Sequence, residues 1–176
     1  MKDEIFIKVR LQHGREAKEK ASSEFSNISG EKLNWQASPL SWSIAQCLDH
    51  LIVSHSVYFP ALKKITDGNF KMNFWKSIAR SPKFGGNIMK EQMQEQVKRK
   101  LKAPKKIQPV SKATLEIIER HDTSIEQFLT YISRCSAIDI DKTIITSPLL
   151  SMITYSKRCL TIQLHMNTGI STRRLG

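Results

Sequence analysis

The sequence predicts an all-α protein, a four-helix bundle with a long crossover connection between helices two and three. Apolar residues recur at intervals of three and four in four long segments, and no segment alternates as a half-buried strand would. About forty residues of irregular pattern separate the second and third segments. Parallel neighbouring helices require such a connection, because the chain must travel the length of the bundle before the next helix begins.

The size and hydropathy of the chain limit the classes of protein to which it can belong. The chain has 176 residues, of which 40% are hydrophobic, so it can bury one core and is short for two. We therefore expect a single globular domain over residues 1–176. No segment approaches the roughly 20 apolar residues that span a bilayer, and no cleavable signal is visible at the N-terminus. A soluble, cytoplasmic protein without membrane contact is the resulting expectation.

The first two helices are expected at residues 3–27 and 43–66. The first has an imperfect apolar face and ends before a serine-glycine stop signal. The second begins near Ser43, whose hydroxyl can accept the unpaired N–H groups of a first turn. His55 lies centrally on the apolar stripe of this second helix, which indicates a hydrogen-bonded core histidine.

Two residues of the second segment should affect its packing and its shape. Trp42 stands at the helix entrance, where we expect it to be largely buried against the bundle. Pro60 removes one N–H and crowds the preceding turn. The sequence therefore predicts a kink close to residues 56–59, and a break there is the alternative.

The third helix, residues 111–135, has the clearest pattern. Apolar residues follow a seven-residue repeat that only Asp122 interrupts: Leu115, Ile118, Ile125, Leu129 and Ile132. A buried carboxylate needs a cation, a hydrogen-bond donor or a metal to offset its desolvation. His121 points about 100° away from Asp122 around the helix, so the two need not share a site. A loop then leads to the fourth helix, expected at residues 149–167.

The net charge of +12 is concentrated in residues 68–112. This segment holds twelve basic residues and only two acidic ones, Glu91 and Glu95. Its aromatic residues lack the spacing of an RNA-binding sheet. We therefore interpret residues 68–112 as a basic segment exposed to solvent, and a nucleic-acid partner is not expected. The three cysteines form no CxxC pair, which favours reduced thiols in the core.

Three motifs together resemble one known family. The stretch from Trp42 to Leu51 joins a tryptophan, a serine cap and a helix that carries His50. His50 lies roughly 120° from the centre of the apolar stripe, so it flanks the core where bundle helices form clefts. A basic, proline-bearing strap at residues 102–109 and a proline-led start of the last segment, Ser147-Pro148, follow. From about residue 35 to the C-terminus, the chain resembles the DinB-like family of metal-binding four-helix bundles.

This resemblance implies a divalent-metal pocket with two histidine ligands in this chain. His50 and His165 match ligand positions on the second and fourth helices. Relatives with an intact site carry His-x-x-x-His on the last helix, but here Gly169 occupies the place of the second histidine. Two imidazoles alone hold a divalent ion weakly. The implied cofactor, zinc or nickel, is therefore expected to be weakly held or absent.

Two classes of function remain open. The resemblance implies a metal-dependent thiol transferase or hydrolase with an incomplete histidine triad, acting on a small-molecule thiol or an electrophile. The alternative is a non-catalytic binding or interaction protein that kept the bundle and lost its metal, which Gly169 favours. A homodimer is compatible with either class, and the sequence identifies no catalytic residue beyond the two metal-ligand candidates.

Overall fold

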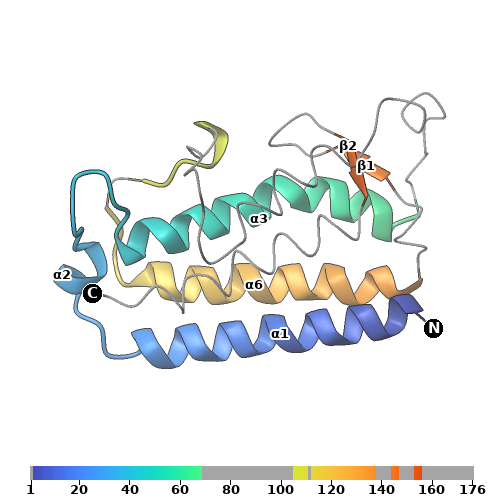
Figure 1. Cartoon of the computed structure of the whole chain (residues 1–176), viewed down its shortest axis with the longest axis horizontal. Coiled ribbons are helices and arrows are strands. Elements are labelled where there is room, and N and C mark those ends of the chain that lie inside the picture. Colours follow the sequence, from blue (N-terminus) through green and yellow to red (C-terminus); the bar gives the residue numbers. More distant parts are fainter. Residues whose placement is uncertain (1, 69–104, 111, 138–143, 147–152, 156–176) are drawn as a thin grey trace.

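The computed structural model describes residues 2–68, 105–110, 112–137, 144–146 and 153–155. Figure 1 colours these parts along the chain and draws the others as a thin grey trace. The described elements are α1 (Lys2–Phe25), α2 (Gly30–Asn34), α3 (Ile44–Thr66), a 3-10 turn η1 (Lys105–Ile107), α6 (Glu116–Arg134), a 3-10 turn η2 (Cys135–Ala137), β1 (Ile144–Thr146) and β2 (Ile153–Tyr155). The all-α class is thereby confirmed.

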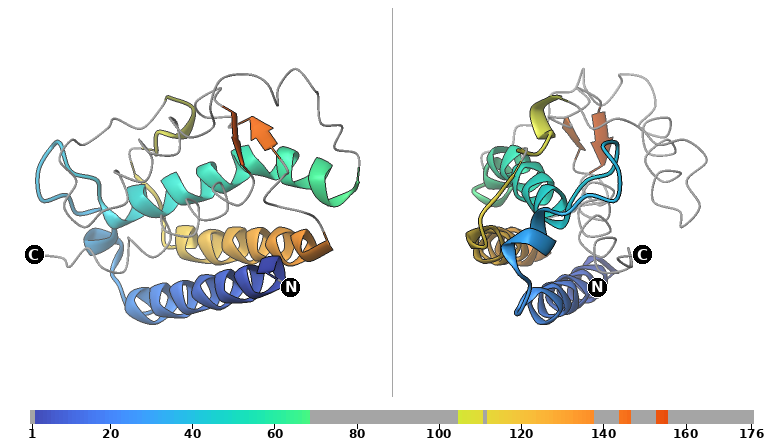
Figure 2. Two further views of the ribbon diagram at one scale, coloured as in Figure 1. Left: turned by 45° about the vertical axis from the view of Figure 1, so that its right-hand side comes forward. Right: turned by 90° about the vertical axis from the view of Figure 1, so that its left-hand side faces the viewer.

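The three long helices lie side by side, and α1 runs antiparallel to both α3 and α6 (Figures 1 and 2). Two buried clusters join them at opposite ends. Ile7 of α1 packs with Ile65 and Cys135 in one cluster, and Phe25 packs with Ile44 and Ile117 in the other. Helices α3 and α6 are therefore parallel. The predicted crossover between them stays a prediction, because residues 69–104 lie outside the described residues.

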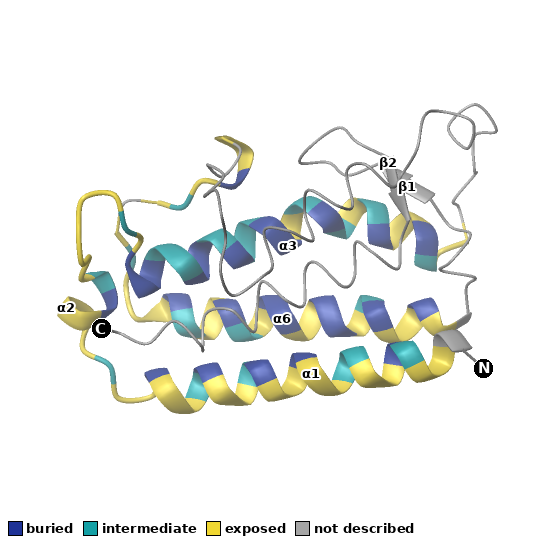
Figure 3. Ribbon diagram, in the orientation of Figure 1, coloured by how far each residue is buried: buried dark blue, intermediate teal, exposed yellow. Residues whose placement is uncertain are grey.

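The bundle buries the facing sides of its helices and exposes their outer sides (Figure 3). The buried row of α6 passes through Ile117, His121, Ser124 and Phe128. Most of the predicted stripe is confirmed, since Ile125, Leu129 and Ile132 are buried; Leu115, which precedes the helix, is 49% exposed. Because α6 packs against α3 and α1 together, its buried face also includes two polar side chains that a count of apolar residues does not detect.

The expectation for the end of the chain is partly wrong. Residues Ile153–Tyr155, expected in the fourth helix, form strand β2, which pairs antiparallel with β1 through Ile145 opposite Thr154. Both strands consist of β-branched and aromatic residues, which favour extended structure. The remainder of the expected helix, residues 149–152 and 156–167, lies outside the described residues. None of the described helices is long and apolar enough to cross a membrane.

Helix α3 begins where the sequence predicted. The Ser43 hydroxyl accepts a hydrogen bond from Gln46 N at 3.2 Å, and Gln46 Oε1 accepts one from Ser43 N at 3.0 Å. This reciprocal capping box satisfies two N–H groups that a helix start leaves unpaired. The helix then continues unbroken through Pro60 to Thr66, so no break occurs there.

The expected burial of Trp42 is wrong. The residue is 40% exposed, because its ring packs against His50 at the edge of the bundle instead of entering the core. The two ring centroids are 4.9 Å apart with an interplanar angle of 51°. Trp42 is therefore a neighbour of the candidate ligand.

Replacing Ser43 with alanine should lower the free energy of unfolding by about 1 kcal/mol, because the first turn of α3 loses its cap. Urea denaturation followed by circular dichroism measures the change. Ser56→Ala is the matched control: this hydroxyl is exposed on the same helix and donates only to Val53 O, at 2.8 Å. Equal losses for both variants would contradict a specific role for the capping box.

Candidate functional site

His50 projects from the first half of α3 toward the segment that leads into α6. Its Nδ1 lies 2.6 Å from the carbonyl oxygen of Ile107. A carbonyl can only accept a hydrogen bond, so Nδ1 must carry the proton. The lone pair of the neutral ring is then on Nε2, and the imidazole presents this nitrogen to a ligand.

The residue before His50 contacts the same segment. The Asp49 carboxylate accepts a hydrogen bond from Val110 N at 2.9 Å, and Asp49 is only 3% exposed. From here on, the strap means residues 105–110, the described segment that overlaps the end of the basic, proline-bearing motif. Two consecutive residues of α3 thus hold the strap, one through a backbone carbonyl and the other through a backbone N–H.

The surroundings of His50 keep its ring neutral near pH 7. Burial lowers the pKa of His50, and this effect outweighs the Ile107 carbonyl and the Asp49 charge, which both favour the protonated ring. Trp42 covers part of the ring at the same time. A neutral imidazole with an available Nε2 is the form that binds a metal ion.

The second candidate ligand, His165, lies outside the described residues, and so does Gly169. The pairing of His50 with His165 therefore stays a prediction. Within the described ranges, no three histidine, cysteine, aspartate or glutamate side chains converge as a metal site would require. The other acidic or histidine side chains near the sequence motif do not join His50 there: Asp49 is engaged with the strap, and His55 lies in the core.

His55 is a hydrogen-bonded core histidine, as predicted. It is fully buried, its Nδ1 lies 2.9 Å from Ser124 Oγ of α6, and its ring stacks on Phe128 with centroids 4.9 Å apart. Burial, reinforced by nearby His121, lowers the pKa of His55 to about 3. The ring is therefore neutral at all ordinary pH values and contributes to packing between α3 and α6.

Asp122 lies at the contact between α6 and α1. Its carboxylate accepts a hydrogen bond from Ser22 Oγ at 2.7 Å, and His121 Nδ1 lies 3.5 Å away. Desolvation raises the pKa of Asp122, but the nearby His121 ring and the hydrogen bond from Ser22 outweigh it and the net shift is downward. The sequence predicted that Asp122 needs a partner. It did not identify Ser22, because nothing in the pattern of α1 distinguishes that serine from its neighbours.

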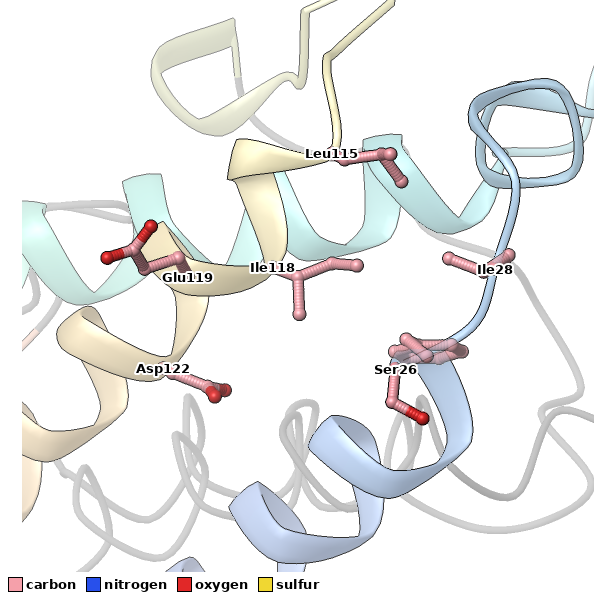
Figure 4. A pocket seen from close by; sticks show the side chains of 7 residues that line it. Ser26, Ile28, Leu115, Ile118, Glu119 and Asp122 are labelled. Atoms are coloured by element: carbon pink, nitrogen blue, oxygen red, sulfur yellow. The ribbon is translucent and has the colours of Figure 1, made fainter.

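Asp122 also borders a hollow between the end of α1 and the start of α6 (Figure 4). The volume is about 370 Å³, with Glu119 and Asp122 on one side and Ser26 and Ile28 on the other. His50 does not line it. The candidate metal ligand and this hollow are therefore separate features.

Comparison with protein families identifies the class of the chain. The family model of the DinB superfamily matches residues 14–167. The chain belongs to the DinB superfamily, and the resemblance noted in its sequence is confirmed. No curated protein matches it, and no solved structure does.

Acid should destabilise the protein through His55. Its pKa is about 3 in the folded state and about 6.5 when unfolded, so the unfolded state binds a proton that the folded state does not. The stabilisation is complete above pH 6.5 and decreases as the pH falls from 6.5 toward 3. We expect a loss of about 2 kcal/mol in the free energy of unfolding between pH 7.5 and pH 5.

Urea denaturation at the two pH values measures this loss. In His55→Asn, whose amide can still bond to Ser124, the same comparison should show a clearly smaller loss. His13→Asn, at an exposed position on α1, is the control and should keep the wild-type dependence. An unchanged pH dependence in His55→Asn would show that another group is responsible.

Proposed function

We propose that this DinB superfamily protein binds zinc or nickel weakly through His50 Nε2 and His165, and uses the metal for thiol transfer or hydrolysis. The hydrogen bond between His50 Nδ1 and the Ile107 carbonyl, 2.6 Å long, is the observation that supports the proposal. Metal-binding histidines commonly donate the proton of their other ring nitrogen to a backbone carbonyl, which fixes the tautomer and the ring orientation.

His50 fits a metal ligand in three respects. Its ring is neutral near pH 7 because burial lowers the pKa, its Nδ1 is already engaged, and the Trp42 ring restricts its movement. A bound divalent ion would supply Lewis acidity, which lowers the pKa of a thiol or a water molecule. The side chains of this chain would contribute ligand orientation and a partly dehydrated surface.

A non-catalytic binding protein is the second candidate function. Gly169 replaces the histidine that completes the triad in relatives. Asp49, the carboxylate nearest to His50 in sequence, is engaged with Val110 and is poorly suited to replace it. In this second function, the chain has kept the bundle and no longer uses a metal.

Restoring the third imidazole distinguishes the two candidates. We expect Gly169→His to raise zinc affinity by about tenfold or more, equivalent to about 1.4 kcal/mol. Calorimetry on protein purified without a metal-affinity tag measures the change. Gly169→Ala is the matched control, since it replaces the glycine without adding a ligand.

Adding His50→Ala to Gly169→His should abolish the gain in zinc affinity. If Gly169→His binds zinc no better than Gly169→Ala, the assignment of a metal site fails and the non-catalytic function is favoured. A gain that persists without His50 would place the metal on other ligands.

A further inference from the structure

We propose that Asp49 is a positioning residue for His50: by holding the strap at Val110, it keeps the Ile107 carbonyl on Nδ1 and leaves Nε2 available to a ligand. The importance of this arrangement for metal binding rests on the proposed function. The arrangement itself consists of hydrogen bonds within the protein and can be tested without a metal.

The burial of Asp49 is the first step of the argument. A carboxylate is almost never this buried unless it is paired or hydrogen-bonded, because desolvation is costly. At 3% exposure, Asp49 accepts the N–H of Val110 at 2.9 Å. Since a charged acceptor forms a stronger hydrogen bond than a neutral one, this contact is a firm attachment point for the strap.

The short distance along the chain between the two attachment points is the second step. Only Gln108 and Pro109 separate Ile107 from Val110, and the proline ring restricts its own φ to about −65°. A backbone N–H fixed at Val110 therefore limits how far the peptide at Ile107 can rotate. The Ile107 side chain, 3% exposed, anchors the same residue, while Asp49 controls the orientation of the chain that follows.

The chemistry of imidazole is the third step. A neutral histidine without constraints favours the tautomer protonated on Nε2, whereas a hydrogen bond from Nδ1 to a carbonyl selects the opposite tautomer. The Ile107 carbonyl imposes this selection on His50. If the strap moves, the proton returns to Nε2 and blocks the nitrogen that a metal would use.

The tautomer of His50 can be measured directly in metal-free protein by long-range ¹H–¹⁵N correlation spectra at alkaline pH, where the ring is neutral. We expect wild-type His50 to be protonated on Nδ1. Asp49→Ala should shift the population to Nε2, and Asp49→Asn should restore the wild-type tautomer because its side-chain carbonyl can accept the Val110 N–H. Asp49→Leu, which suits a buried position, provides a second variant without the acceptor if Asp49→Ala does not fold.

The matched control is Asp67→Ala, at an exposed carboxylate of the α3 C-cap that pairs with Lys63. It should leave the His50 tautomer unchanged. An Nε2-protonated ring in the wild type, or wild-type spectra in folded Asp49→Leu, would overturn the proposal. In the second case, the Ile107 side chain alone would position the carbonyl.

Metal affinity separates this inference from the proposed function. In the Gly169→His background, Asp49→Leu should weaken zinc binding by about 10–100-fold, the usual cost of losing an outer-shell partner. A tautomer shift in a protein that binds no zinc in any variant would retain the positioning role and reject the metal function. Zinc binding through His50, with a His50 tautomer that Asp49→Leu leaves unaltered, would retain the metal function and reject the positioning role of Asp49.

Discussion

The parallel packing of α3 against α6 is the interaction on which the rest of the structure depends. At its centre, His55 bonds to Ser124 and stacks on Phe128, and buried clusters close both ends, where α1 joins them. The two helices run in the same direction, and the described segment that leads into α6 contacts α3 on the way. This segment is the strap, residues 105–110, which contacts α3 at Asp49 and His50.

Polar groups buried between α3 and α6 lower the stability of the fold and make the pairing of the two helices more specific. Among the described residues, Ser54 Oγ and His121 Nε2 are buried and have no hydrogen-bond partner, and an unsatisfied buried polar group costs about 1–3 kcal/mol. The bond between His55 and Ser124 forms in only one register of α3 against α6. We infer that this polar pair selects the register, which an apolar stripe alone would specify less strictly.

His50 and His55 occupy the same helix but differ chemically. Burial lowers the pKa of both rings, yet their partners are not equivalent. The Ile107 carbonyl can only accept a hydrogen bond, so it determines the tautomer of His50. The Ser124 hydroxyl can donate or accept, so it does not by itself determine the tautomer of His55. A defined orientation and a fixed lone pair suit His50 to ligand binding, and complete burial suits His55 to the core.

The sequence by itself determined the helical class, the start of α3 at Ser43, the core position of His55 and membership of the DinB superfamily. These features depend on local periodicity, on capping and on short motifs. Only the tertiary structure decided that Trp42 is partly exposed, that residues 153–155 pair as a strand, and that Asp49 and His50 hold the strap. These features depend on contacts between segments far apart in the chain, and a pattern along one helix does not specify which backbone group will meet its side chains.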